Sequence, residues 1–209
     1  MDKQAYNGYE HANLNRRKGH HMDTPSEGTV VYEGKLIRVR KVPVSQPDGR
    51  IALYDIVDHP DAVGIVAIRT DLAPEGSNEP WVALVHQARP AIGKETWEIP
   101  AGLVDSGEEH DGQRTAEREL LEETGFVAAS FEHLHTHYPS PGFMNEAIAL
   151  YLARGLTVAP GAPAPDVNEI SALEWKPLRE AMRMCVAGEI DDGKTVIGLW
   201  LARDVLENR

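Results

Sequence analysis

The first half of the chain carries its hydrophobic residues in short runs rather than at helical spacing. Runs rich in Val and Ile cover residues 29–44, 50–59, 62–70 and 81–90, and turn-forming segments separate them. Such runs, bounded by Gly, Pro and Asp, are typical of β-strands. Pro47-Asp48-Gly49 is the clearest turn, because each of its residues favours a tight reversal of the chain. We therefore predict strands in the four runs, with a hairpin at this turn.

From residue 112 the pattern changes to helical spacing. A helix is predicted over 112–124, with Asp111 as its amino-terminal cap and Gly125 as its carboxyl-terminal cap. Ala116 and Leu120 stand four residues apart in this otherwise polar segment. They give the helix one apolar stripe with which it can pack on a sheet.

The remainder of the chain combines both patterns. We expect strands at 131–138 and 146–156, followed by a loop rich in Pro, Ala and Gly at 155–169. A further strand is expected at 170–176, and two helices at 177–188 and 195–206. Many strands, one helix, more strands and then two helices argue for the α+β class, in which a mixed sheet packs between helices. Residues 1–26 are polar and aperiodic, and we expect a flexible tail there.

Charge and composition narrow the class of partner. The 209 residues suit one domain with a small extension, and the formal net charge is -12. Nucleic acids and anionic membranes are poor partners for so acidic a surface, and a small anionic substrate would need a local Arg cluster or metal ions. The chain has one cysteine and no apolar run of membrane-spanning length. We therefore expect a cytoplasmic protein without an internal disulfide.

The helix predicted over 112–124 brings like charges together. Glu119 lies three residues from Glu122 and four from Glu123, so the three carboxylates occupy adjoining positions on one face. Each like-charged pair costs roughly 0.2–0.5 kcal/mol on an isolated helix, and the last helical turn favours cations instead. Arg118 offsets only part of this charge. A solvated helix face would explain a single pair of neighbouring glutamates. Three carboxylates in the last turns of a helix instead indicate a bound divalent cation such as Mg²⁺ or Mn²⁺, which prefers hard oxygen ligands.

The same stretch resembles the signature of the Nudix hydrolases. That signature is a Gly, five residues, Glu, seven residues, Arg-Glu, an aliphatic residue, any residue, Glu-Glu, any residue, Gly and an aliphatic or aromatic residue. It is matched by Gly102, Glu108, Arg118, Glu119, Leu120, Glu122, Glu123, Gly125 and Phe126. The chain departs from it at one point, because nine residues rather than seven separate Glu108 from Arg118. The resemblance implies an α/β/α sandwich with a mixed sheet, preceded by a small antiparallel β segment.

Flanking motifs resemble the ADP-ribose pyrophosphatase branch of that family. They are 87–90 (QARP), 97–102 (WEIPAG), 138–143 (YPSPGF), 145–146 (NE) and 188–195 (GEIDDGKT). The resemblance covers about residues 28–205 and implies that ADP-ribose and water give AMP and ribose 5-phosphate. GDP-mannose and other nucleoside diphosphate sugar pyrophosphatases share much of this pattern, so their substrates stay open as alternatives.

The resemblance also implies the residues that hold the metal. Glu119 and Glu123 would be the principal ligands of Mg²⁺ or Mn²⁺, and Glu122 and the carbonyl of Ala101 would complete the set. Arg118 would orient the glutamates. Cations held in this way clamp a diphosphate and acidify a bound water. By the same resemblance, Glu122 and Arg118 count among the catalytic residues.

Further residues are implied for the substrate. Arg89 resembles the family's diphosphate-binding arginine, whose fork suits phosphate geometry, and Gly102 and Glu108 belong to the same substrate-binding stretch. The general base in relatives is often a Glu in a late loop. Glu169 fits that description better than Asp166 does, and a plain exposed acid is the alternative. A loop position would permit closure over the substrate.

Residues 27–60 resemble a segment that, in relatives, exchanges between the subunits of a homodimer and helps to hold the adenine. On that analogy Arg50 or Tyr54 would reach the partner's site, although both also fit as ordinary strand residues. Residues 61–209 would then form the hydrolase domain.

Two other motifs in the chain resemble sites of other kinds. Residues 188–195 satisfy the P-loop pattern, but a P-loop follows a strand and the preceding residues favour a helix. His133, His135 and His137 alternate, which predicts a shared polar face of a strand rather than a zinc site. A Nudix module that senses a nucleotide without cleaving it is the alternative of another class. Such a module has no physical reason to retain mutually repelling carboxylates.

Overall fold

The computed structural model describes residues 28–105, 112–161 and 170–208. At its centre is a seven-stranded sheet in the order β12-β5-β4-β10-β9, with β6 paired to β5 and β7 paired to β4. The strands are Ala62–Arg69 (β4), Trp81–Arg89 (β5), Lys94–Glu98 (β6), Ala101–Leu103 (β7), Ser130–His137 (β9), Ile148–Arg154 (β10) and Ile170–Pro177 (β12). In the described part of this sheet, β10 runs parallel to β4 and the other pairs are antiparallel.

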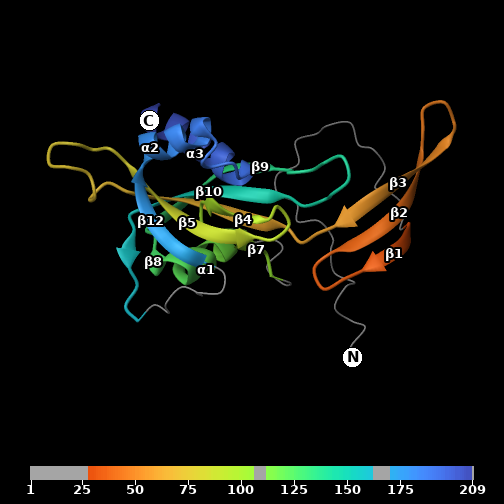
Figure 1. Cartoon of the computed structure of the whole chain (residues 1–209), viewed down its shortest axis with the longest axis horizontal. Helices are drawn as coiled ribbons and strands as arrows, with labels where there is room; N and C mark the ends of the chain where they lie inside the picture. Colours follow the sequence, from red (N-terminus) through yellow and green to blue (C-terminus); the bar gives the residue numbers. More distant parts are fainter. Residues whose placement is uncertain (1–27, 106–111, 162–169, 209) are drawn as a thin grey trace.

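Helices cover both faces of this sheet (Figure 1). Helix α1 (Gly112–Thr124) packs on one face, and helices α2 (Leu178–Ala187) and α3 (Gly193–Glu207) pack on the other. The central strand β4 contributes to both cores, since Val63 and Ile65 belong to the core under α1 and Val66 and Ile68 to the core under α2 and α3. The predicted α+β fold, with a mixed sheet between helices, is confirmed. No helix in the described ranges is long and apolar enough to cross a membrane.

The ends of the helices follow local sequence signals. Helix α1 has its predicted bounds and is followed by Gly125, whose φ of 74° is in the left-handed region that glycine adopts readily. Helix α3 begins earlier than predicted because the Asp192 carboxylate accepts a hydrogen bond from the Thr195 N–H at 2.9 Å and caps the first turn. Asp111, the cap predicted for α1, lies outside the described residues.

Several short strands were not predicted from the sequence. Strands β6 and β7 were not anticipated, nor were β8 (Phe126–Val127) and β11 (Thr157–Val158), which pair with each other. The predicted run 29–44 forms two strands, β1 (Thr29–Glu33) and β2 (Arg38–Ser45). Segments of two to five residues are too short to show a periodic pattern, so their pairing depends on partners elsewhere in the fold.

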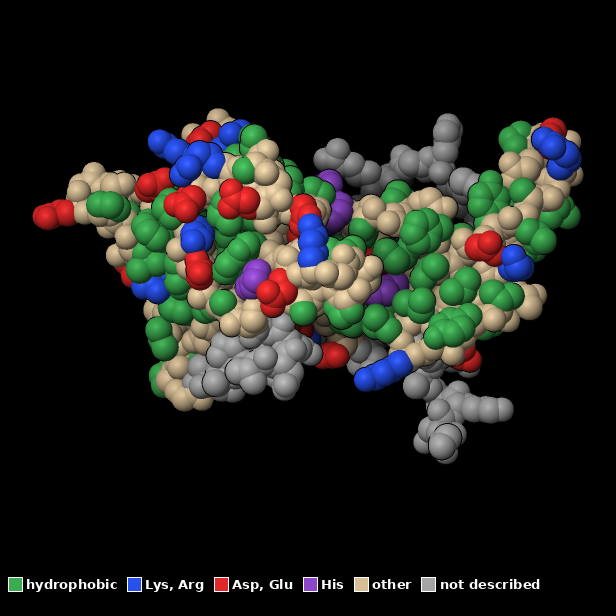
Figure 2. Space-filling model, viewed as in Figure 1, with side chains coloured by type: hydrophobic (Ala, Val, Ile, Leu, Met, Phe, Trp, Pro, Cys, Tyr) green, Lys and Arg blue, Asp and Glu red, His purple; other side chains and the backbone are tan. Residues whose placement is uncertain are grey.

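A separate three-stranded antiparallel sheet is formed by β1, β2 and β3 (Ile51–Asp58), with the predicted turn between β2 and β3. It projects from one end of the main sheet (Figure 1). Apolar side chains gather on its surface (Figure 2), and exposed among them are Val30, Val31, Tyr32, Leu36, Ile51, Leu53 and Tyr54. So much exposed apolar surface on one small sheet is typical of a contact face.

Asp58 fixes the junction between the two sheets. Its carboxylate accepts hydrogen bonds from Nε of Arg38 at 2.9 Å, Nε of Arg40 at 2.6 Å and Nδ2 of Asn145 at 3.1 Å. The side-chain oxygen of Asn145 in turn accepts the N–H of His59 at 2.9 Å. The last residue of β3 is thereby tied to the segment that precedes β10.

The three histidines of β9 do not share one face, so that part of the sequence analysis was wrong. The register between β9 and β10 shifts, so that His135 pairs with Leu150 but His133 pairs with Tyr151. Consecutive residues of β10 point to opposite faces, and directly paired residues point to the same face. His133 accordingly contacts the ring of Tyr151, at 5.5 Å between ring centroids. A β-bulge of this kind is invisible to a count of alternating residues.

Candidate active site

Helix α1 brings two glutamates against the edge of the main sheet. Ala116 and Leu120 are fully buried in the core between α1 and the sheet, as the predicted apolar stripe requires. They fix the rotation of the helix, so that Glu119 and Glu123, four residues apart, point toward β7. The glutamates that would repel one another on an isolated helix therefore lie against the end of a strand rather than in open solvent.

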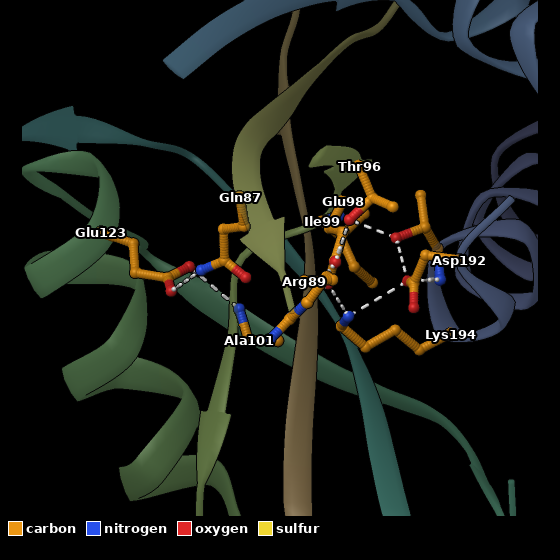
Figure 3. A network of polar contacts seen from close by, with 10 residues as sticks. Gln87, Arg89, Thr96, Glu98, Ile99, Ala101, Glu123, Asp192 and Lys194 are labelled. Carbon is orange, nitrogen blue, oxygen red and sulfur yellow. Dashed lines mark hydrogen bonds and ion pairs between the residues drawn. The ribbon is translucent and has the colours of Figure 1, made fainter. Parts of the chain in front are cut away.

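Glu123 is the most deeply buried carboxylate of α1, with 7% of the residue exposed. Its Oε2 accepts the Ala101 N–H at 3.0 Å and its Oε1 accepts Nε2 of Gln87 at 3.3 Å (Figure 3). Burial raises the pKa of Glu123 to about 8, and the charge of Glu119 acts in the same direction. An additional positive charge here would therefore stabilise the ionised carboxylate.

Glu119 occupies the space beside Gly102. A β-carbon at Gly102 would lie 2.0 Å from Oε1 of Glu119, so a side chain at this position would displace the carboxylate. Burial raises the pKa of Glu119 to about 7, although Nη1 of Arg118 lies 2.7 Å from Oε1 and acts in the opposite direction. Gly102, which the resemblance places in the substrate-binding stretch, has a steric reason to be glycine.

Arg118 lies among the acidic side chains at this end of the molecule. Its Nη1 donates to Glu122 at 2.9 Å, and its Nη2 lies 3.1 Å from the Asp105 carboxylate and donates to the Leu103 carbonyl at 3.3 Å. These contacts connect α1 to the end of β7. The Glu122 side chain is 51% exposed, so Glu122 lies at the outer edge of the site and Glu119 and Glu123 line its interior.

The arrangement fits a divalent cation at Glu119 and Glu123. Burial raises both pKa values, which means that the surrounding protein does not fully compensate the two ionised carboxylates. Among the described residues, no group of three or more His, Cys, Asp or Glu side chains is already gathered as a metal site. A cation would therefore take two carboxylates from the protein and complete its shell with the Ala101 carbonyl, water or substrate phosphate, as Mg²⁺ commonly does.

The β5–β6 hairpin supplies the basic side of the site. Gln87, Arg89, Thr96 and Glu98 lie on one face of the hairpin, because Gln87 pairs with Thr96 and the others are two residues away along their strands. Arg89 donates from Nε to Oε1 of Glu98 at 2.6 Å and from Nη2 to Oε2 at 2.5 Å (Figure 3). Gln87 connects this face to Glu123.

Glu98 is ionised at every physiological pH. Its burial alone would raise the pKa, but the hydrogen bonds and charges of Arg89 and Lys194, with a hydrogen bond from Thr96, lower it to about 2. The carboxylate is thus a fixed negative charge that binds Arg89 in place. Arg89 keeps 43% of its side chain exposed, so the guanidinium is accessible to a ligand.

The structure does not bring the remaining predicted site residues to this site. Arg50 and Tyr54 lie on the small N-terminal sheet, at the opposite end of the molecule from α1 (Figure 1). Arg50 pairs with Asp48 of its own turn at 2.6 Å, and Tyr54 is exposed. Glu108 and Glu169 lie outside the described residues, so their roles stay predictions.

Sequence reasoning did not assign individual roles to Gln87, Glu98 and Lys194. A polar residue in a mostly apolar strand was the available signal for Gln87, since buried polar groups need partners. No such signal marks Glu98, because its strand β6 is mostly polar. Lys194 belongs to the P-loop-like segment 188–195. The rejection of a P-loop is confirmed, because helix α2 precedes the segment and the Asp192 carboxylate accepts the Thr195 N–H.

Fold and site together define a class of protein: an α/β/α sandwich in which one helix holds a buried and a partly buried glutamate beside a glycine and an arginine-bearing hairpin. A NUDIX domain model matches residues 58–196, and the chain therefore belongs to the Nudix family. The resemblance drawn from the residues is thus confirmed.

Individual relatives agree with this assignment. The chain is 36% identical to the methanol dehydrogenase activator of Bacillus methanolicus over 169 residues, which cover 81% of this chain and 86% of that protein. It is 33% identical to the ADP-ribose pyrophosphatase of Mycobacterium tuberculosis over 180 residues, which cover 86% of this chain and 82% of that protein. The crystal structure of an ADP compounds hydrolase matches with a TM-score of 0.71 at 22% identity, covering 92% of this chain and 98% of that one, which supports the fold.

Proposed function

We propose that this protein is a metal-dependent pyrophosphatase that hydrolyses the diphosphate of ADP-ribose, or of a related nucleoside diphosphate sugar. The observation that carries the proposal is the pair of carboxylates formed by the partly buried Glu119 and the buried Glu123, whose pKa values are raised to about 7 and about 8. Perturbed carboxyls grouped with an accessible arginine are typical of a reaction centre. With ADP-ribose the products would be AMP and ribose 5-phosphate.

The described residues suggest a division of roles. Glu119, Glu123 and the Ala101 carbonyl would hold Mg²⁺ or Mn²⁺, with Glu122 at the outer edge, and Arg118 would keep Glu119 in position. The bound cation would neutralise the diphosphate and lower the pKa of a water nucleophile. The Arg89 fork would bind the diphosphate. Glu169 remains our candidate for the general base, and Gly102 and Glu108 remain candidates for the substrate-binding stretch.

We propose further that the protein works as a homodimer. The support is the exposed apolar surface of the β1–β3 sheet, which a second copy of the chain would cover. This arrangement would also explain how Arg50 and Tyr54, remote from their own α1, could contact a substrate in the partner's site. We expect the enzyme in the cytoplasm, since its single Cys185 needs no oxidising compartment.

The test is product release from a panel of substrates, with Mg²⁺, with Mn²⁺ and with EDTA. The panel contains ADP-ribose, GDP-mannose, diadenosine polyphosphates, NADH and coenzyme A. Preferred, EDTA-sensitive release of AMP from ADP-ribose supports the proposal. Cleavage of another compound alone keeps the Glu119–Glu123 chemistry but replaces the substrate.

A regulatory module is the second candidate, and the relationship to a protein named methanol dehydrogenase activator favours it. Such a module would bind a nucleotide and act on a partner enzyme. Absence of turnover across the whole panel, from protein whose folding is shown by circular dichroism, would replace the pyrophosphatase proposal with this one.

A further inference from the structure

Lys194 is a charged side chain in an unusual place. It lies in the first turn of α3, and only 9% of its side chain is exposed. Lysine is almost never buried to this extent unless its charge is paired. The partners of its ammonium are the carboxylates of Glu98 and Asp192, the latter at 3.1 Å.

The contact with Glu98 connects Lys194 to Arg89. The Glu98 side chain is 2% exposed, and the same Oε2 atom accepts hydrogen bonds from both Lys194 Nζ and Arg89 Nη2 (Figure 3). Oε1 accepts Arg89 Nε at 2.6 Å and the Thr96 hydroxyl at 2.5 Å. The carboxylate therefore has donors on both oxygens and cannot rotate without breaking several contacts at once.

This arrangement determines what Arg89 presents to a ligand. A guanidinium has five N–H donors, and two of those in Arg89 are engaged by Glu98, which leaves the edge containing Nη1 for an anion. An isolated Arg89–Glu98 pair would be neutral. Lys194 makes the group of three formally positive, but Asp192 on its other side makes the group of four neutral, so the effect of Lys194 on Arg89 is one of position rather than of net charge.

We propose that Lys194 is a positioning residue for the substrate diphosphate: acting through Glu98, it fixes the orientation of Arg89. This inference rests on the proposed function, in which Arg89 binds the diphosphate. It also gives a role to the segment 188–195, whose lysine would serve the phosphate site indirectly rather than by touching phosphate as in a P-loop.

A purely mechanical role for Lys194 is the competing explanation. The segment just before α3 is also joined to the β5–β6 hairpin, by an exposed ion pair between Lys94 and Asp191. If Lys194 only ties α3 to the hairpin, its loss should lower stability without depending on whether Arg89 is present. If it acts through Arg89, its loss should have little effect once Arg89 has been removed.

The experiment is a double-mutant cycle with Lys194→Met and Arg89→Gln. The affinity for ADP-ribose is measured by calorimetry in EDTA, and KM and kcat are measured with Mg²⁺. We expect each single variant to weaken binding and raise KM by about tenfold, with kcat changed by less than about threefold. The double variant should bind ADP-ribose as tightly as Arg89→Gln alone does, to within about twofold.

The control is Asp191→Asn, which breaks the neighbouring ion pair between the same two elements and leaves Glu98 untouched. It should bind ADP-ribose as the unchanged protein does. If Lys194→Met does not fold, Glu98→Gln replaces it in the cycle, because it interrupts the same connection at its middle residue.

If the losses of affinity in the two single variants multiply, so that the double variant binds ADP-ribose about a hundredfold more weakly, the two residues act independently. That result would overturn the inference and leave the pyrophosphatase proposal intact. Unchanged affinity in Arg89→Gln would overturn both the inference and the assignment of Arg89. If the protein binds ADP-ribose but turns over no substrate, the pyrophosphatase proposal fails alone, since calorimetry still reads the coupling between Lys194 and Arg89.

Discussion

Gly102 and Glu119 share one space between β7 and α1. The Glu119 carboxylate lies so close to the α-carbon of Gly102 that a β-carbon would be 2.0 Å from Oε1, well inside the contact distance of any real pair of atoms. The glycine therefore lets the helix bring its carboxylate against the strand.

Gly102→Ala should misplace Glu119. Because the methyl group cannot be accommodated beside the carboxylate, Glu119 must swing outward, and we expect metal-dependent turnover to fall by about 10- to 100-fold. Steady-state assays at several Mg²⁺ concentrations measure the effect. Gly193→Ala is the control, since a β-carbon at that position meets open space. Equal activity in the two variants would contradict the proposed position of Glu119 at the metal.

Glu123→Gln should abolish most turnover while the protein stays folded. The amide keeps the shape of the side chain but removes the charge that would bind the cation, so we expect a loss of at least about a hundredfold. The matched control is Glu117→Gln on the exposed side of the same helix, where the carboxylate accepts a hydrogen bond from the side chain of Gln113. Full activity in Glu123→Gln would exclude this residue as a ligand.

The stability of the metal-free protein should fall as the pH rises. The pKa values of Glu119 and Glu123 are raised from 4.5 to about 7 and about 8, so between pH 4.5 and these values the folded state holds protons that the unfolded state has lost. The stability that these groups contribute is complete below pH 4.5 and is lost as the pH rises through 7 and 8. Thermal unfolding in EDTA across this range measures the trend.

Mg²⁺ should remove this trend, because a bound cation favours the ionised carboxylates. Glu123→Gln should also reduce the pH dependence of the melting temperature in EDTA, because the carboxyl with the higher pKa is then absent. A melting temperature in EDTA that is independent of pH would show that the two carboxyls are not perturbed as described.

Leu53→Asp should separate the proposed homodimer into monomers. Leu53 is exposed on the β1–β3 sheet, and a carboxylate there would have to be desolvated if a second copy covers this face. Light scattering coupled to gel filtration gives the mass directly. Val186→Asp makes the same kind of change at an exposed position of α2 and should leave the assembly unchanged. A monomeric mass for the wild-type protein would contradict the proposed homodimer.

Much of the fold and part of the site could be predicted from local patterns. The helix over 112–124, its acidic turn, Gly102 and the strands 50–59, 62–70 and 81–90 are each specified by residues close together in sequence. Periodicity, turn chemistry and the spacing of the Glu residues are properties of a short segment, so the sequence by itself determined the class of chemistry and the family resemblance.

Only the tertiary structure decided what surrounds those residues. The raised pKa of Glu123 comes from its burial between α1 and the sheet, which outweighs the hydrogen bond from the Ala101 N–H. The low pKa of Glu98 comes from Arg89 and Lys194. The opposite facing of His133 and His135 comes from one shift in strand register. Pairing, register and burial depend on contacts between segments far apart in the chain, and a local pattern carries no information about which segments will meet.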